Sequence, residues 1–181
     1  MEANDILDQN FKEPGQERIE IELLSPTKFI FLDVLSFGLY STWWTYKAWC
    51  FFQRRDQLDI NPAFRAIIYI FYLHALLEKI QINAKKLAYT PSFSSVKTFI
   101  LILFLELFGW LPDPWWLVSF VSFLPYLKPL GAFNDIIEHD NFSQVKVTNE
   151  FNVPQLIFIL IGLLFWGVIS LGYFFPVAPE L

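Results

Sequence analysis

The feature that most constrains this chain is an uncharged apolar segment near its C-terminus. Residues 155–174, QLIFILIGLLFWGVISLGYF, contain no Asp, Glu, Lys or Arg. An α-helix rises about 1.5 Å per residue, so a segment of this length crosses a hydrocarbon core of about 30 Å. Pro154 stands at the expected first turn and Pro176 lies just beyond the end. The segment therefore predicts a transmembrane helix.

The rest of the chain agrees with a membrane location. Only 17% of its 181 residues are charged and 55% are apolar, whereas soluble domains carry about a quarter charged residues. Further apolar blocks predict spans at about 29–52, 98–111 and 115–127. Pro112-Asp113-Pro114 separates the last two, because proline cannot continue a helix. We expect a tight turn there, with a single broken helix as the alternative.

Residues 62–79 are harder to place. Their uninterrupted apolar stretch is only about twelve residues long, which favours a re-entrant or interfacial helix over a span. The sequence thus predicts an all-α, polytopic helical membrane protein with about four transmembrane helices and one re-entrant or interfacial helix. Its expected parts are an acidic extramembrane tail (1–26), a membrane domain (27–175) and a short C-terminal tail (176–181).

The charges of the loops predict a topology. Basic residues gather in the segments 53–64, 80–96 and 128–153, while the Pro-Asp-Pro turn and the C-terminal tail have none. The positive-inside rule then places the three basic loops in the cytoplasm and both termini outside. We expect a multi-pass protein of the bacterial inner membrane.

Two short alternating segments suggest a different arrangement. Residues 18–23 (RIEIEL) and 144–147 (QVKV) alternate as strands do and have opposite charge character. Pairing between them requires both to lie on one side of the membrane. In that case the first apolar block must be a bent hairpin that returns to its own side.

Three polar residues inside apolar segments are candidates for chemistry. Charges at membrane depth are costly and often functional, and Asp33, His74 and Glu106 are in such segments. A pair of Glu106 or Asp33 with His74 would relay protons or bind a cation. The alternative is that each carboxyl is hydrogen-bonded and only orients the helices.

Other chemistry finds little support in the sequence. Hydrolase motifs, a glycine-rich phosphate loop and metal-ligand spacing are all missing, so we predict no catalytic residue, metal or cofactor. The single cysteine, Cys50, excludes an intramolecular disulfide. The net charge of −5 arises within residues 1–26, and no basic surface predicts nucleic-acid binding.

The segment Ser36–Trp49, SFGLYSTWWTYKAW, concentrates aromatic and small residues. Gly38, Ser41, Thr45 and Ala48 would form a stripe of small residues along one helix face, which lets two membrane helices approach closely. The aromatic and basic residues predict anchoring at the membrane interface, where Trp, Tyr and snorkelling Lys side chains concentrate. These expected anchors are Tyr40, Trp43, Trp44, Lys47, Trp49, Arg54 and Arg55, with Trp110, Trp115 and Trp116 at the opposite interface.

The same segment carries a family resemblance. GLYSTWWTYKAW, preceded by Ser36-Phe37, resembles the S/T-F-G-L-Y and W-x-Y-K-x-W pattern of small bacterial inner-membrane proteins grouped as domains of unknown function. NPAFRAIIYIFYLHALLEKI, LPYLKPLGAFNDI and NEFNV are similar to later segments of that group, so the resemblance covers about residues 25–173. It implies a multi-pass membrane location and no established activity.

These observations favour a non-enzymatic role. We expect a subunit or assembly partner that docks other membrane proteins or a second copy of itself through the stripe of small residues, and that contacts the lipid bilayer. The alternative is a small ion- or proton-conducting or transport protein that uses Glu106 and His74. A third hypothesis is binding of a lipid or lipophilic molecule among the aromatic side chains.

Overall fold

The computed structural model describes residues 19–87, 93–112, 114–140, 143–146 and 150–174. The chain is mostly helical, which confirms the predicted helical class. In chain order the elements are β1 (Ile19–Glu22), α1 (Pro26–Leu35), α2 (Leu39–Arg55), α3 (Pro62–Ile67), α4 (Tyr69–Lys86), α5 (Ser95–Leu107), the 3₁₀ helices η1 (Phe108–Trp110) and η2 (Trp115–Tyr126), α6 (Leu127–His139), β2 (Ser143–Lys146) and α7 (Val153–Phe174).

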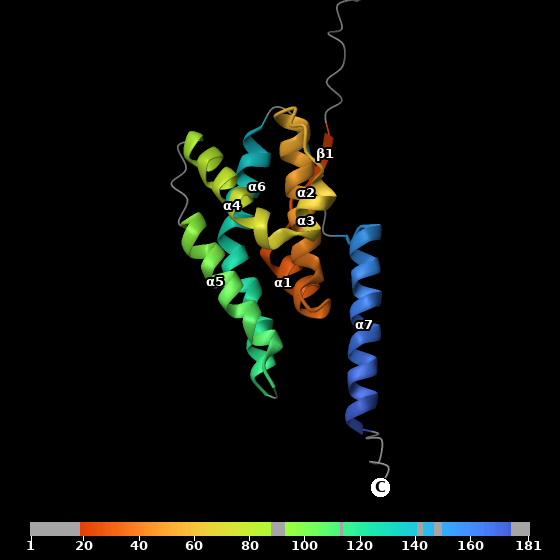
Figure 1. Ribbon diagram of the computed structural model, residues 1–181. Helices are drawn as coiled ribbons and strands as arrows, with labels where there is room; N and C mark the ends of the chain where they lie inside the picture. The colour runs from red at the N-terminus through yellow and green to blue at the C-terminus, as the bar shows by residue number, and fades with distance from the viewer. Residues whose placement is uncertain (1–18, 88–92, 113, 141–142, 147–149, 175–181) are drawn as a thin grey trace, which may run out of the picture.

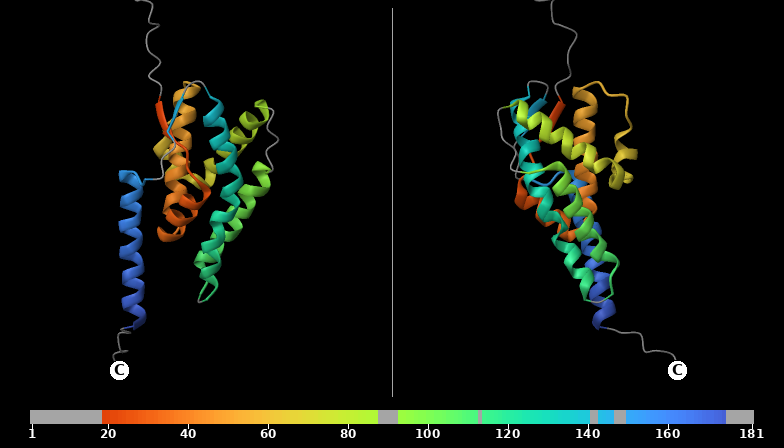
Figure 2. Two further views of the ribbon diagram at one scale, coloured as in Figure 1. Left: turned by 180° about the vertical axis from the view of Figure 1, so that it is seen from behind. Right: turned by 60° about the vertical axis from the view of Figure 1, so that its left-hand side comes forward.

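The molecule has two ends of different character (Figure 1). The sheet end holds β1, β2 and the C-terminal ends of α2, α4 and α6. The hairpin end holds the C-terminal end of α7, the α1–α2 turn, and the hairpin that α5 and η1 form with η2. In Figure 1 and in the left view of Figure 2, α7 runs beside the rest of the molecule toward the hairpin end.

The block at 29–52 is not one span, and this prediction was wrong. α1 ends at Leu35 and α2 begins at Leu39, and the two form a bent hairpin. Phe37 and Gly38 adopt positive φ angles of 54° and 80°, which lie in the left-handed region and cannot continue a right-handed helix. The hairpin follows from Gly38, because glycine adopts this conformation without steric cost.

The structure confirms the alternative arrangement, in which the two alternating segments pair as strands. β1 pairs with β2 in parallel, with Ile19 opposite Ser143 and Glu22 opposite Lys146. Residues 19–22 thus lie on the same side of the molecule as the loop that contains β2. The prediction that the N-terminal segment and this loop lie on opposite sides of a membrane is wrong for residues 19–22. Residues 1–18 and 175–181 lie outside the described residues.

The remaining elements agree in part with the predicted blocks. The segment 62–79 is two helices, α3 and α4, which meet at Ile68. The predicted spans at 98–111 and 115–127 correspond to α5 with η1 and to η2, so the turn interpretation around Pro112 holds. η2 continues into α6, a helix within the segment 128–153 that was predicted to be a loop. α7 confirms the helix expected at 155–174.

A hydrophobic core joins the helices of the sheet end. Its fully buried members include Phe29 of α1, Phe52 of α2, Leu76 of α4 and Leu130 of α6. Burying each such side chain contributes about 1.5–3 kcal/mol. This core fixes α2 against α4 and α6 and so holds the α1–α2 hairpin in place.

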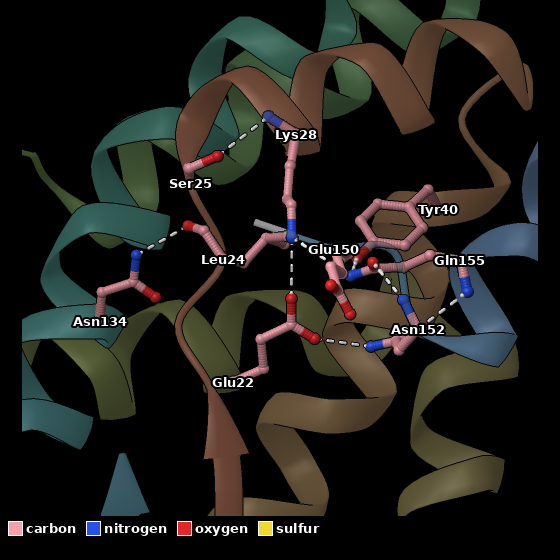
Figure 3. Close-up of polar contacts among 9 residues, drawn as sticks. All are labelled: Glu22, Leu24, Ser25, Lys28, Tyr40, Asn134, Glu150, Asn152 and Gln155. Atoms are coloured by element: carbon pink, nitrogen blue, oxygen red, sulfur yellow. Dashed lines mark hydrogen bonds and ion pairs between the residues drawn. The ribbon is translucent and has the colours of Figure 1, made fainter. Parts of the chain in front are cut away.

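Hydrogen bonds fix the start of α7 (Figure 3). The Asn152 side chain accepts from the Gln155 backbone N–H at 3.0 Å, and the Gln155 side chain accepts from the Asn152 backbone N–H at 3.1 Å. This reciprocal pair satisfies two backbone donors that a helix start leaves free. The same two side chains also donate outward, from Asn152 Nδ2 to Glu22 Oε2 and from Gln155 Nε2 to the Tyr40 hydroxyl. The start of α7 is thereby attached to both β1 and α2.

Two helical segments are long and apolar enough to cross a membrane, Trp115–His139 and Val153–Gly172. The first joins η2 to α6 and the second lies within α7. Among the described residues, the other predicted spans do not reach this length and hydropathy as continuous helices.

Candidate functional site

The α1–α2 turn places Asp33 at the start of α2. Gly38 occupies the position before the first helical residue and has no side chain with which to cap α2. Asp33 supplies the missing acceptor, since its Oδ1 accepts from the Ser41 backbone N–H at 2.8 Å. Ser36 Oγ accepts from the Tyr40 N–H at 3.1 Å. Asp33 is 3% exposed, and its carboxylate is stabilised by a backbone donor at a helix N-terminus.

Glu106 reaches the same region from α5. Its carboxylate accepts a hydrogen bond from the hydroxyl of Tyr69, the first residue of α4. The side chain is half-buried. A carboxylate with one side-chain donor and partial exposure keeps acceptor positions for another group.

A cavity of about 580 Å³ brings the two acids together. Its walls come from the α1–α2 turn, the first turn of α4, and the hairpin of α5, η1 and η2. Asp33, Ser41, Tyr69, Glu106 and Ser122 supply oxygen atoms to a lining that is otherwise largely apolar and aromatic. We refer to it as the acidic cavity.

Aromatic rings join the α1–α2 turn to η2 and to α7. Phe37, at the tip of the α1–α2 turn, lies 5.3 Å between ring centroids from Phe120 of η2. It lies 5.6 Å from Phe165 and 5.1 Å from Trp166 of α7. Such contacts each add about 0.5–1.5 kcal/mol beyond area burial, which offsets the backbone strain of Phe37.

His74 does not line the acidic cavity. Its ring packs against Phe99 of α5, with 5.6 Å between centroids, and the predicted pairing of His74 with Asp33 or Glu106 does not appear among the hydrogen bonds of the described residues. Tyr69, five residues earlier in the chain, takes that place. Tyr69 is not predictable from the sequence, because one tyrosine among several in an aromatic segment carries no distinguishing pattern.

The predicted stripe of small residues packs largely against other elements of the same molecule. Ser41, Thr45 and Ala48 are buried, and Gly38 forms the turn. Ser41 Oγ donates to the Gly38 carbonyl and Thr45 Oγ1 donates to the Ser41 carbonyl. The stripe does allow close packing, but its partners are other elements of the same molecule. It therefore offers little surface to a second protein.

The predicted interface anchors divide into two groups. Tyr40, Trp44 and Trp49 of α2 are buried and belong to the core, so these three are not exposed at a lipid surface. Arg65 lies over the Trp49 ring at 4.5 Å from its centroid. Trp110 and Trp115 are 91% and 58% exposed at the tip of the hairpin, and Trp116 is half-buried beside the acidic cavity.

The two adjacent arginines also differ. Arg55 forms ion pairs with Asp56 at 2.7 Å and with Asp140 at 3.4 Å, and its guanidinium lies over Phe52. Arg54 is exposed and, with Trp43 and Lys47, lines a second cavity beside the start of α7. The two roles differ because neighbouring residues on a helix point to different faces, and the adjacent basic letters in the sequence do not show which face packs against the protein.

The chain was compared with known proteins at three levels. No family model, curated protein or solved structure matches it. The resemblance to the bacterial inner-membrane group stays a prediction. Among the described residues, no group of three or more His, Cys, Asp or Glu side chains is placed to hold a metal ion.

Proposed function

We propose that the protein is an integral membrane protein inserted by its hairpin end. Residues 98–127 and 153–174 contain no Lys or Arg, and the surfaces of α5, η2 and α7 expose many large apolar side chains, among them Leu101, Phe104, Leu117, Leu124, Leu160, Leu164 and Val168. An exposed apolar surface of this extent fits hydrocarbon better than water. The basic residues of α2 and α4 lie toward the sheet end, which fits the cytoplasmic side of an inner membrane.

Within that membrane we propose conduction or transport of protons or small cations. The observation that carries this proposal is the acidic cavity, in which Asp33 and Glu106 from different helices line one space at the apolar hairpin end. Carboxylates at membrane depth are expensive and mark ion or proton pathways. Asp33 holds the turn and contributes negative charge, while Glu106 is the group that exchanges a proton or contacts the cation.

Flux through liposomes containing the purified protein tests this function. An internal pH dye would report proton entry driven by a potassium gradient and valinomycin. We expect Glu106→Gln to lower the flux at least about ten-fold, as for loss of an essential proton carrier. Glu78→Gln, which neutralises an exposed glutamate of α4, should leave the flux unchanged. Flux no greater than in protein-free liposomes, for protons and for sodium or potassium, would reject the proposal.

Assembly with other membrane proteins is the second candidate. The observation in its favour is the exposed face of α7, where a Cβ added at Gly167 or Gly172 meets nothing within 4 Å. We therefore move the proposed docking surface from the α2 stripe to α7. Gly167→Leu with Gly172→Leu should abolish co-purification of a partner or a second copy if α7 docks another helix. Unchanged co-purification would reject that surface.

A further inference from the structure

The second cavity lies beside the start of α7 and has a volume of about 430 Å³. Residues of β1, α2, α6 and α7 line it. From α2 it receives the aromatic rings of Trp43 and Trp44 and the cationic side chains of Lys47 and Arg54. We refer to it as the basic cavity.

The positive charge of the basic cavity is not neutralised by its own lining. Glu22 is the acid among the lining residues, and its two carboxylate oxygens already bind Lys28 Nζ at 3.0 Å and Asn152 Nδ2 at 2.7 Å (Figure 3). Lys47 and Arg54 form no ion pair with any described residue. Lys47 lies 5.9 Å from the centroid of the Trp43 ring, which holds its stem against the cavity wall.

The two cations determine which ligand suits the cavity. Lys47 and Arg54 lie beside aromatic rings in one lining, and together they suit an anion with several acceptor oxygens, such as a phosphate. Trp44 of the same lining is 4% exposed, and its indole Nε1–H is enclosed by the protein, so this N–H does not reach an anion in the cavity.

The position of the cavity indicates where such a phosphate comes from. Pro154 and Gln155 line the cavity at the point where the uncharged stretch of α7 begins. Immediately beyond them α7 exposes Leu156, Ile157 and Leu160. A phospholipid headgroup lies at the surface of the hydrocarbon core, so its acyl chains would continue along these exposed side chains.

We propose that the basic cavity binds the headgroup phosphate of an anionic phospholipid. Lys47 and Arg54 contact the phosphate oxygens, and the acyl chains lie along α7. A net negative lipid is preferred over a zwitterionic one, because the amine of a zwitterionic headgroup offsets the phosphate charge. The proposal depends on insertion in the membrane but not on flux through the acidic cavity.

Native mass spectrometry of the detergent-solubilised full chain tests the site. The protein would be mixed with equal amounts of phosphatidylglycerol and phosphatidylcholine of identical acyl chains. We expect the natural chain to retain phosphatidylglycerol preferentially. The double variant Lys47→Gln/Arg54→Gln should lower that preference about ten-fold or more, as expected for the loss of charge-assisted contacts.

A charge-matched control distinguishes lipid binding at this site from general electrostatic attraction between anionic lipid and the protein. Lys85→Gln/Lys97→Gln removes the same charge from exposed positions of α4 and α5 that do not line the basic cavity, and should leave the preference unchanged. Equal retention of the two lipids, or equal loss in both double variants, would overturn the proposal. Displacement of the lipid by millimolar inorganic phosphate would assign the cavity to free phosphate and also overturn it. A chain that does not sediment with membranes would instead overturn the proposed insertion.

Discussion

Gly38 controls the direction of the chain at the residue scale. Its φ of 80° lies in the left-handed region, where a side chain costs about 1–2 kcal/mol. A Cβ at this position meets nothing within 4 Å, so the cost of Gly38→Ala comes from backbone conformation and not from a clash. We expect Gly38→Ala to lower the free energy of unfolding by about 1–2 kcal/mol, measured as a lower melting temperature in detergent.

Gly131 provides the matched control for this substitution. It lies inside α6, and a Cβ there also meets nothing within 4 Å. Because glycine inside a helix is less favourable than alanine by about 0.5–1 kcal/mol, Gly131→Ala should be neutral or stabilising. Equal melting temperatures of the Gly38→Ala and Gly131→Ala variants would contradict the role of Gly38 in the turn.

Asp56 gives the sheet end a dependence on pH. Burial raises the pKa of this carboxyl, but hydrogen bonds from Arg55 and Lys79 outweigh burial and hold the pKa below its ordinary value of 3.8. The folded state therefore favours the ionised form more than the unfolded state does. This stabilisation is complete well above the unfolded pKa and is lost as the pH falls through the lower pKa of the folded state.

The melting temperatures of the natural chain and of Asp56→Asn test this dependence. The natural chain should melt higher at about pH 7, and the difference should shrink as the pH falls below about 4. Asp59→Asn is the control, because Asp59 is exposed and forms no ion pair with a described residue. A difference between the natural chain and Asp56→Asn that grows toward low pH would show that the sign of the shift is wrong.

At the scale of elements, the start of α7 depends on side-chain hydrogen bonds. Asn152 both caps α7 and bonds Glu22, so Asn152→Ala removes a helix cap and a contact with β1. Loss of a cap costs about 1 kcal/mol, and we expect at least that loss in the free energy of unfolding. Ser94→Ala should have little effect, because Ser94 precedes α5 without a side-chain capping bond. Melting temperatures in detergent would compare the two variants, and equal changes would argue against the cap.

The elements also show what the sequence can predict. The helix α7 and the turn between α5 and η2 were predictable, because each follows from a local property of the sequence. The α7 segment is long and uncharged, and the turn contains prolines. The bent hairpin followed only as the alternative, and its break was not placed at Gly38, because a glycine in an apolar block serves equally as a turn or as a small packing residue. The pairing of β1 with β2 joins residues that are distant in the chain. Only the alternation of apolar and polar residues in the two segments predicted it.

The candidate site was predictable to a similar extent. Asp33 and Glu106 were found because acids are rare in apolar blocks, and the structure does place them on one cavity. His74 was chosen by the same reasoning, but helix packing brings Tyr69 to Glu106 instead. Which polar groups meet is decided by the tertiary packing of α4 against α5, and no local pattern encodes it.

At the scale of the whole molecule, the two ends predict a simple topology. The hairpin of α5, η1 and η2 and the turn between α1 and α2 both return to the side from which they started, whereas α7 starts beside β1 and ends at the hairpin end (Figures 1 and 2). On this arrangement the sheet end lies entirely on one side of the membrane, together with the basic residues of α2 and α4. The tip of the hairpin lies toward the opposite surface.

Thiol labelling of single-cysteine variants tests this topology. In a Cys50→Ser background, Lys86→Cys and His139→Cys place a thiol at the sheet end, and Leu111→Cys places one at the hairpin tip; all three residues are exposed. A membrane-impermeant reagent should label positions 86 and 139 only in inverted vesicles, because the positive-inside rule puts their basic surroundings in the cytoplasm. It should label position 111 only from the opposite side. Labelling of positions 86 and 139 from different sides of the membrane would contradict the prediction that the whole sheet end lies on one side. Labelling of position 111 from the same side as position 139 would show that the hairpin does not cross the membrane.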